Sequence, residues 1–439
     1  MKNPTWTLAT LLTFVLLVVN APGKAAAQYT ATNLISNTSL YDPGAIDPNL
    51  VDAWGLAALP NSPWWVSAQN ASKSTLYSAG GAINSLVVDI PCVTDPATGA
   101  TTQVCPLPGE GEVDEPNNPN VIPGGNAACT GSGSPNPPCC TGSGTGSCIA
   151  SFSGGPAGLV ANPYANAFNV TDGGSAQFIF STQDGLIVAW NSSDGTQSIV
   201  EANRSLQGTA PFFTSYQGLA IAGPAKDPHL YATNIFGGVD VFDTSFNYVD
   251  SFAADSDLPN PSGPEGPFLT YGIQAIGSKL YVTYFAPLAP FPPAGNGAGI
   301  LDVCDLSKKP TEPTCRRLAA SNLDGTETSP TLNAPWGIAL APSNFGKLSN
   351  LLLVGNLNDG TIHGFDPQTG RLRGTLETAV DTPFALPGLW SLQFGDGSSA
   401  NGPRNHLFFT AGPSPVSASD LIQQYGAGVF GVITVDPKH

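Results

Sequence analysis

The chain has 439 residues, with 15 basic and 32 acidic side chains, so its formal net charge is −17. A chain this acidic excludes nucleic-acid binding through clustered lysine and arginine, and it excludes electrostatic docking to anionic lipid. Fifty glycines, 41 prolines and a charged fraction of only 11% predict short strands joined by tight turns rather than helices.

The N-terminus has the pattern of a secretory signal peptide. Lys2 provides a positive charge, an apolar run extends over residues 8–19, and residues 25–27 are three alanines that suit signal cleavage. The run is shorter than the roughly 20 residues that span a bilayer. We therefore predict that residues 1–27 are removed, and that the mature chain from Gln28 is periplasmic or extracellular, with no membrane span.

A two-part unit recurs along residues 28–439. Its first part is a short apolar strand built on a glycine, with copies at 54–57, 157–160, 217–220, 271–274 and 336–339 and a degenerate copy at 388–392. Its second part is a strand, a turn and a strand, with copies that start at Trp64, Phe178, Leu230, Leu280, Leu351 and Leu407. Such self-similarity indicates a repeat architecture.

The spacing of the unit matches the blades of a β-propeller. The glycines of successive copies, from Gly158 to Gly388, are separated by 60, 54, 65 and 51 residues, which is room for a four-stranded blade and its loops. We predict an all-β chain folded as one six-bladed propeller over residues 28–439, with a pair of β-sandwiches as the alternative. Strands at 29–35 and 428–435 are expected to pair within one blade and close the ring.

All eight cysteines lie after the predicted signal peptide, which favours disulfides over metal binding because the spacings do not resemble those of zinc sites. Cys304 and Cys315 flank a short excursion and are expected to pair locally. The segment 92–150 is rich in Gly, Pro and Ser, and we interpret it as a surface insertion between the first and second blades. Its six cysteines are expected to pair among themselves, in an order that the sequence does not determine: Cys92, Cys105, Cys129, Cys139, Cys140 and Cys148.

With these repeats the chain resembles a family of uncharacterised exported bacterial proteins whose architecture is that of NHL-type propellers. The resemblance covers nearly all of residues 28–439 and implies the propeller fold and export, with no established activity. The insertion at 92–150 departs from the family pattern. The motifs that carry the resemblance lie at 47–57, 62–67, 332–342, 353–360, 408–412 and 428–431.

Two asparagines follow the second strand of their repeats in the same phase. Asn234 and Asn356 occupy this position, and Ser181 was aligned with them in the second repeat. Lactonase-like propellers, which the chain resembles in this respect, hold calcium at one mouth of the channel, so the two amides are candidate ligands of a Ca²⁺ ion. Tyr284 stands at the corresponding position of the fourth repeat and does not suit a full metal site, and support of a turn is the alternative role for the asparagines.

Aromatic residues precede the glycine of the first strand in several repeats. Trp54, Tyr271 and Trp336 are therefore candidate ligand-binding residues at a channel mouth, where they would stack on a sugar or another flat ligand; wedging between blades is the alternative. The sequence shows no catalytic motif such as a Gly-x-Ser-x-Gly elbow, and its four histidines have no metal-ligand spacing. Catalytic residues are unassigned.

Two functions fit these sequence features. We favour a binding or scaffold module for an extracytoplasmic protein, a glycan or a small molecule. The alternative is a divalent-cation-dependent hydrolase or lyase of the lactonase type, acting in the central channel. The fold alone does not choose between them, because propellers host unrelated functions.

Overall fold

The computed structural model describes residues 28–95, 98–103, 105, 155–171, 173–209, 212–253, 258, 268–286, 298–307, 309–321, 323, 327, 330–379, 382–413 and 426–436. The predicted signal peptide at 1–27 lies outside these residues. Within the described residues, no helix is long and apolar enough to cross a membrane.

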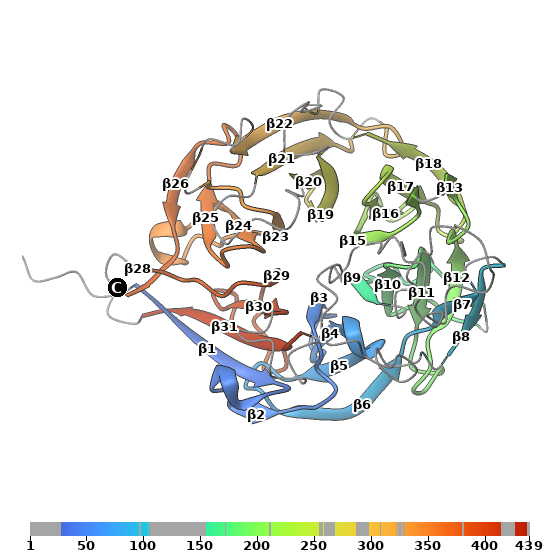
Figure 1. Cartoon of the computed structure of the whole chain (residues 1–439), viewed down its shortest axis with the longest axis horizontal. Coiled ribbons are helices and arrows are strands. Elements are labelled where there is room, and N and C mark those ends of the chain that lie inside the picture. The colour runs from blue at the N-terminus through green and yellow to red at the C-terminus, as the bar shows by residue number, and fades with distance from the viewer. Residues whose placement is uncertain are drawn as a thin grey trace, which may run out of the picture.

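The described chain forms six blades arranged radially around one axis (Figure 1), five of them four-stranded antiparallel sheets and one a five-stranded sheet, so the predicted six-bladed propeller is confirmed. Blade 1 consists of β3 (Ala53–Ala57), β4 (Trp64–Ala68), β5 (Lys73–Tyr77) and β6 (Ile83–Asp89). Blade 2 consists of β9 (Pro156–Ala161), β10 (Phe178–Thr182), β11 (Leu186–Trp190) and β12 (Ile199–Asn203). Blade 3 consists of β15 (Tyr216–Ala222), β16 (His229–Asn234), β17 (Gly238–Phe242) and β18 (Tyr248–Phe252).

Blade 4 consists of β19 (Leu269–Ile276), β20 (Lys279–Ala286), β21 (Ala298–Asp305) and β22 (Thr314–Ser321). Blade 5 consists of β23 (Pro335–Leu340), β24 (Leu352–Asn356), β25 (Ile362–Phe365) and β26 (Leu372–Thr375). Blade 6 consists of β29 (Leu389–Phe394), β30 (Leu407–Ala411), β31 (Val429–Val435) and β1 (Tyr29–Ser36), with the short β2 (Ala45–Ile46) at its edge. In every blade the first strand in this order lies nearest the axis (Figure 1).

The ring closes by pairing the two ends of the chain. β1 runs antiparallel to β31, with Tyr29 opposite Val435 and Ser36 opposite Val429, so the predicted pairing of these strands is confirmed. The Tyr29 hydroxyl also donates to the backbone oxygen of Phe345 at 2.9 Å and accepts from the backbone N–H of Leu348 at 3.1 Å. These bonds fasten the first strand of the chain to blade 5 as well as to blade 6.

The core lies between neighbouring blades. Trp65 of blade 1 stacks on Phe178 of blade 2, with ring centroids 4.1 Å apart, and Trp64 packs against Phe408 of blade 6 at 4.8 Å. These rings are almost fully buried. Each such side chain contributes roughly 1.5–3 kcal/mol by leaving water, which explains why sheets that bury little alone are stable when stacked radially.

Every innermost strand contains a β-bulge at the repeated glycine motif. In β23, for example, Trp336 and Gly337 together oppose the single residue Gly355 of β24, because the register shifts between Pro335 and Ile338. The same two-against-one arrangement occurs in the other five blades, where the single opposing residues are Ser67, Ser181, Thr233, Thr283 and Thr410. A bulge re-aims the side chains beside it.

The bulge corrects the register that the sequence suggested for the sixth copy. Trp390 and Ser391 oppose Thr410 there, so Ser391 rather than Gly388 occupies the position of the repeated glycine. The glycine itself is required where the next blade approaches closely. A Cβ atom on Gly272 would lie 2.2 Å from the backbone oxygen of Trp336, so a side chain there would force the two innermost strands apart.

Threonine hydroxyls join neighbouring blades at the bulges. Thr283 Oγ1 accepts from the backbone N–H of Gly272 in its own blade at 2.8 Å and donates to the backbone oxygen of Pro335 in blade 5 at 2.6 Å. Thr233 makes the equivalent pair of bonds to Gly218 and to the Tyr271 backbone oxygen. The hydroxyl therefore satisfies backbone groups that the bulge leaves unpaired, and it joins blade 3 to blade 4 and blade 4 to blade 5. Thr410 joins blade 6 to blade 1 in the same way, whereas Ser67 and Ser181 make no such bond.

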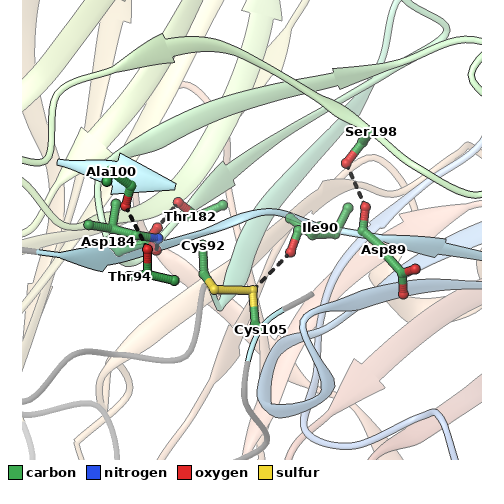
Figure 2. The surroundings of a disulfide bond; sticks show 10 residues. Asp89, Ile90, Cys92, Thr94, Ala100, Cys105, Thr182, Asp184 and Ser198 are labelled. Atoms are coloured by element: carbon green, nitrogen blue, oxygen red, sulfur yellow. Dashed lines mark hydrogen bonds between the residues drawn. A yellow bond between two sulfur atoms is a disulfide. The ribbon is translucent and has the colours of Figure 1, made fainter. Parts of the chain in front are cut away.

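The described part of the insertion is a short hairpin that packs on blade 2. Strand β7 (Cys92–Asp95) pairs with β8 (Ala100–Thr102), and a disulfide joins Cys92 to Cys105 beside it (Figure 2). The backbone N–H of Val93 donates to Asp184 Oδ2 at 2.7 Å, and Asn203 Nδ2 donates to the backbone oxygen of Gly99 at 2.8 Å. Both contacts lie at one end of the β11–β12 pair, where Leu186 pairs with Asn203, and there blade 2 holds the start of the insertion.

A second disulfide joins Cys304 and Cys315, which lie directly opposite one another on β21 and β22. The pairing of the other cysteines of the insertion lies outside the described residues. These are Cys129, Cys139, Cys140 and Cys148.

Candidate ligand site at the channel mouth

The innermost strands all begin at the same face of the ring, and their first residues surround one mouth of the channel. In each strand, the residue just before the bulge glycine or serine belongs to this layer, which we call the mouth ring. Because the bulge sits at the same point of each blade, six residues from distant parts of the sequence come together. The mouth ring consists of Trp54, Ala157, Gln217, Tyr271, Trp336 and Trp390.

Aromatic rings occupy four of the six positions of the mouth ring, in blades 4, 5, 6 and 1. Trp54 stacks on Trp390 with ring centroids 3.5 Å apart and an interplanar angle of 23°. Trp336 and Tyr271 each meet Trp390 edge-on at 5.8 Å. The four rings are between 5% and 7% exposed, so they wedge the blades together as well as line the mouth. The structure thus brings together the candidate residues Trp54, Tyr271 and Trp336.

Amide side chains form a second group at the mouth. Gln69 Nε2 donates to Gln183 Oε1 at 2.6 Å, and Gln183 Nε2 donates to Gln217 Oε1 at 3.3 Å. Gln217 Nε2 in turn donates to Ser215 Oγ at 3.0 Å. Blade 2 has the small Ala157 in the mouth ring, and the Gln69 amide lies against the neighbouring Gly155, where a Cβ atom would be 2.4 Å from Gln69 Nε2. The mouth therefore combines aromatic rings with a chain of amides.

Below the mouth ring the channel is narrow, and its lining combines aliphatic side chains with the polar Gln274, Ser391 and Gln393. One leucine or isoleucine from each innermost strand lines a cavity of about 20 Å³, which has room for about one water molecule. A ligand larger than water therefore contacts the ring from the mouth. The six side chains are Leu56, Leu159, Leu219, Ile273, Ile338 and Leu392.

Asp52 is the acidic group of this site. Its carboxylate packs against Gly412, where a Cβ atom would lie 1.7 Å from Asp52 Oδ1, and it accepts from Asn70 Nδ2 at 3.4 Å. Burial raises the pKa of Asp52 to about 7, and the indole N–H groups of Trp54 and Trp390 oppose this rise. The two indoles are close enough for that effect, but they do not reach ordinary hydrogen-bond geometry with any acceptor of the described chain.

The same environment acts on Tyr271. Burial, and then the nearby charge of Asp52, raise the pKa of the Tyr271 hydroxyl well above its usual range. The effect places Asp52 beside a third ring of the mouth. Trp336 Nε1, like those of Trp54 and Trp390, is buried with no acceptor in the described part of the chain. An unpaired buried donor costs about 1–3 kcal/mol, which makes these indoles natural partners for an acceptor that a ligand brings.

A left-handed backbone conformation recurs two residues before each tryptophan of the mouth ring. Asp52 has φ 52°, Ala334 has φ 53°, and Gly388 has φ 86°. A left-handed conformation at a non-glycine residue costs of order 1–3 kcal/mol and is often retained at functional sites. The three blades with a tryptophan in the mouth ring therefore share a local turn at this position that the other three blades lack.

Asn234 and Asn356 form hydrogen bonds with the loops that lead into the innermost strands of their blades. Asn356 Oδ1 accepts from the backbone N–H of Asn333 at 3.0 Å, and its Nδ2 donates to Thr361 Oγ1 at 3.1 Å. Asn234 Oδ1 accepts from the backbone N–H groups of Ser215 and Phe236, both at 3.3 Å. These contacts give both amides a turn-supporting role.

The register also corrects the alignment of the second repeat. Thr182 faces Pro156, as Asn356 faces Pro335 in blade 5, so Thr182 rather than Ser181 stands in the phase of the asparagines. Among the described residues, no group of three or more His, Cys, Asp or Glu side chains could hold a metal ion. Calcium binding by Asn234 and Asn356 stays a prediction.

Asp52 and Trp390 were not among the candidate residues predicted from the sequence. Asp52 looks like an ordinary turn residue before a strand, and its importance comes from Gly412 and Trp390, which are more than 330 residues away. Trp390 belongs to the degenerate sixth copy, where serine replaces the glycine that marks the motif. A search for an aromatic residue two positions before an apolar one would have found it.

No family model matches this sequence. An uncharacterised protein of Acanthamoeba polyphaga mimivirus is 30% identical over 280 residues, which are 60% of this chain and 61% of that protein. A second uncharacterised mimivirus protein is 26% identical over 385 residues, which are 84% of this chain and 80% of that protein. The chain thus spans less than two thirds of the first relative.

These relatives are viral, so they give no support to the expected membership of a bacterial exported family, although the propeller that the resemblance implied is present. Among solved structures, the α-L-arabinofuranosidase Arb93A of Fusarium graminearum is similar, with 12% identity and a TM-score of 0.46 over 93% of this chain and 98% of that one. This likeness carries no argument about activity.

Proposed function

We propose that the chain is an exported binding module that recognises a saccharide at the channel mouth. The observation that carries the proposal is the meeting of two kinds of side chain at the mouth, the four aromatic rings of the mouth ring and the chain of amides formed by Gln69, Gln183 and Gln217. Indole rings present flat apolar faces to the C–H groups of a sugar ring, while carboxamides exchange hydrogen bonds with its hydroxyl groups. A pocket of apolar rings with a few placed polar groups is typical of ligand sites.

The unpaired indole N–H groups support the same ligand class. Trp336 has a buried Nε1 with no acceptor in the described chain, and the Nε1 atoms of Trp54 and Trp390 lie near the Asp52 carboxylate without an ordinary hydrogen bond to it. A sugar hydroxyl or ring oxygen accepts such hydrogen bonds, and the cost of the unpaired donors is then removed on binding. Because the four rings are nearly buried, we expect the rings to move apart as the ligand enters, and we expect an association rate below the roughly 10⁵–10⁷ M⁻¹s⁻¹ of preformed sites.

Export belongs to the proposal. The segment 1–27 has the charge, apolar run and small-residue cleavage site of a signal peptide, and the Cys92–Cys105 and Cys304–Cys315 disulfides suit an oxidising compartment. We propose that the mature chain acts outside the cytoplasm.

Tryptophan fluorescence tests the proposal, since the mouth holds three of the seven tryptophans. We expect purified residues 28–439 to show a saturable fluorescence change with at least one member of a panel of neutral and amino-substituted oligosaccharides. Trp336→Ala and Gln217→Ala should each weaken that binding by about tenfold or more, whereas Trp65→Phe, between blades 1 and 2, should leave it unchanged. No response to any saccharide, or equal binding by the mouth variants, would contradict the proposal.

A further inference from the structure

The Asp52 side chain is half-buried among neutral groups. The indole N–H groups of Trp54 and Trp390 and the amide of Asn70 are its polar neighbours. Within the described part of the chain, Asp52 makes no ion pair with a lysine, an arginine or a histidine. An ionised carboxylate in such surroundings lacks a positive partner, and taking an unpaired charge out of water is costly.

The chain is shaped to keep this carboxylate in place. Asp52 adopts a left-handed conformation, with φ 52°, and glycines stand where its side chain passes. A Cβ atom on Gly412 would lie 1.7 Å from Asp52 Oδ1, and one on Gly426 would lie 3.2 Å from Asp52 Cβ. A residue held in a strained conformation between two glycines indicates a position that the surrounding structure fixes, and such positions are often functional.

Aromatic rings surround the same carboxylate. Trp54 and Trp390 are its neighbours, and Tyr271 is near enough that the charge of Asp52 alters its pKa. Trp336 completes the cluster by its edge-on contact with Trp390. Ring faces attract cations through their quadrupoles, and desolvated cation–π contacts are worth about 2 kcal/mol or more. Rings and one carboxylate together favour a ligand with a single positive charge.

We infer that the saccharide bound at the mouth is an amino sugar with a free, protonated amine, which pairs with the Asp52 carboxylate among the rings of Trp54, Tyr271, Trp336 and Trp390. This inference rests on the proposed function, because it names the ligand class of the same site. The hydroxyl groups of the sugar accept from the indole N–H groups, and its ammonium group replaces the missing partner of Asp52. The net charge of −17 attracts such a ligand from solution.

Calorimetry with three matched ligands tests the inference: oligomers of glucosamine, of N-acetylglucosamine and of glucose, at equal chain length. Acetylation removes the charge of the amine and leaves the sugar ring. We expect the glucosamine oligomer to bind at least tenfold more tightly than the other two at pH 7. Asp52→Asn should abolish this preference while weaker binding of the neutral oligomers remains.

Proton release gives a second readout that a purely structural role would not produce. Pairing with an ammonium group favours the ionised carboxylate, so the wild-type chain should release protons on binding glucosamine oligomers near pH 6.5, and Asp52→Asn should not. Asp227→Asn removes the same charge from an exposed loop and should change neither the preference nor the proton release. That control separates direct pairing from long-range attraction.

The outcomes distinguish the two proposals. If neutral and amine-bearing oligomers bind equally well and Asp52→Asn has no effect on either, the inference about the amine is wrong and saccharide binding stands. If none of the three oligomers binds the wild-type chain, both the inference and the proposed function fail for these sugars. A preference for glucosamine oligomers that survives in Asp52→Asn would also overturn the assignment to this residue.

Discussion

The backbone conformation and the environment of Asp52 are both unfavourable in free energy, and the rest of the fold must offset them. It combines a left-handed backbone with a carboxylate whose pKa burial raises to about 7. An unfolded aspartate has a pKa of about 3.9, so the folded chain binds the proton of Asp52 more tightly than the unfolded chain does. The stabilisation that this proton gives is complete below about pH 4 and is lost as the pH rises to about 7.

The Asp52→Asn variant is expected to be more stable than the wild-type chain at pH 8. Asparagine is neutral at every pH and tolerates the left-handed conformation, so the variant avoids ionising a buried group. We expect a gain of roughly 1–3 kcal/mol at pH 8 and little difference at pH 4. Thermal unfolding at both pH values measures it, and equal melting points at pH 8 would show that Asp52 is not buried as described.

The Asp366→Asn variant is a control for which the expected change in melting point has the opposite sign. The backbone N–H of Thr369 and the side chain of Arg373 lower the pKa of Asp366 below its usual range. A lowered pKa contributes stability that is present at neutral pH and is lost on acidification. Replacing Asp366 should therefore lower the melting point at neutral pH, whereas replacing Asp52 should raise it.

The candidate site was only partly predictable at this scale. Trp54, Tyr271 and Trp336 were found because the repeat places them before its glycine, and a repeat is visible in sequence. Asp52 occurs once, and the groups that give it its properties belong to blade 6, so no local pattern identifies it. The Gln69, Gln183 and Gln217 chain was missed for the same reason, since two of its members lie in turns rather than in the repeated strand.

At the level of the strand, the repeated unit is a bulge with a hydroxyl opposite it. The glycine allows the next blade to approach, and the hydroxyl of Thr233, Thr283 or Thr410 satisfies the backbone that the bulge frees. Blade 5 has Gly355 at this position, where the side chain of Leu389 occupies the space and would lie 2.8 Å from an added Cβ. Packing between blades replaces the hydroxyl there.

Replacing Thr283 by valine should destabilise the ring. Valine has nearly the same shape but leaves the Gly272 N–H and the Pro335 oxygen without their partner. Unpaired buried groups cost about 1–3 kcal/mol each, so we expect a loss of roughly 2–5 kcal/mol in the free energy of unfolding, measured with urea. Thr283→Ser keeps the hydroxyl and should lose much less; equal losses in the two variants would assign the effect to packing instead.

The insertion hairpin depends on a different contact. Val93 donates its backbone N–H to Asp184, whose other carboxylate oxygen accepts from Thr182 (Figure 2). Asp184→Ala should release the hairpin at 92–102, so that its amides exchange hydrogen faster while those of β10 and β11 keep their protection. Asn203→Ala removes the second contact, to Gly99, and should have an additional effect. Unchanged exchange in both variants would show that the disulfide alone holds the hairpin.

For the whole molecule, the sequence was a good guide because the fold is a repeat. Six copies of one motif predicted six blades, and the apolar strands at both ends predicted the closure by β1 and β31. The exceptions have physical causes. The sixth copy was placed three residues early because Ser391 stands for the expected glycine, and the pairing of β29 with β30 rather than the sequence motif reveals its register.

The last prediction concerns β1, the strand that closes the ring. β1 supplies the outer strand of blade 6 and anchors Tyr29 to Phe345 and Leu348 of blade 5. A chain that starts at residue 37 leaves β31 as an open edge and uncovers the apolar face that β1 protects. We expect this chain to lose cooperative unfolding and to aggregate, and we expect a peptide of residues 28–46 added in excess to restore a single transition, because strand pairing needs no covalent link. A Tyr29→Phe variant keeps the strand and loses only the two hydroxyl bonds, so it should unfold cooperatively with a loss of about 1–3 kcal/mol. If the shortened chain unfolds like the intact one without the peptide, the ring does not depend on this strand for closure.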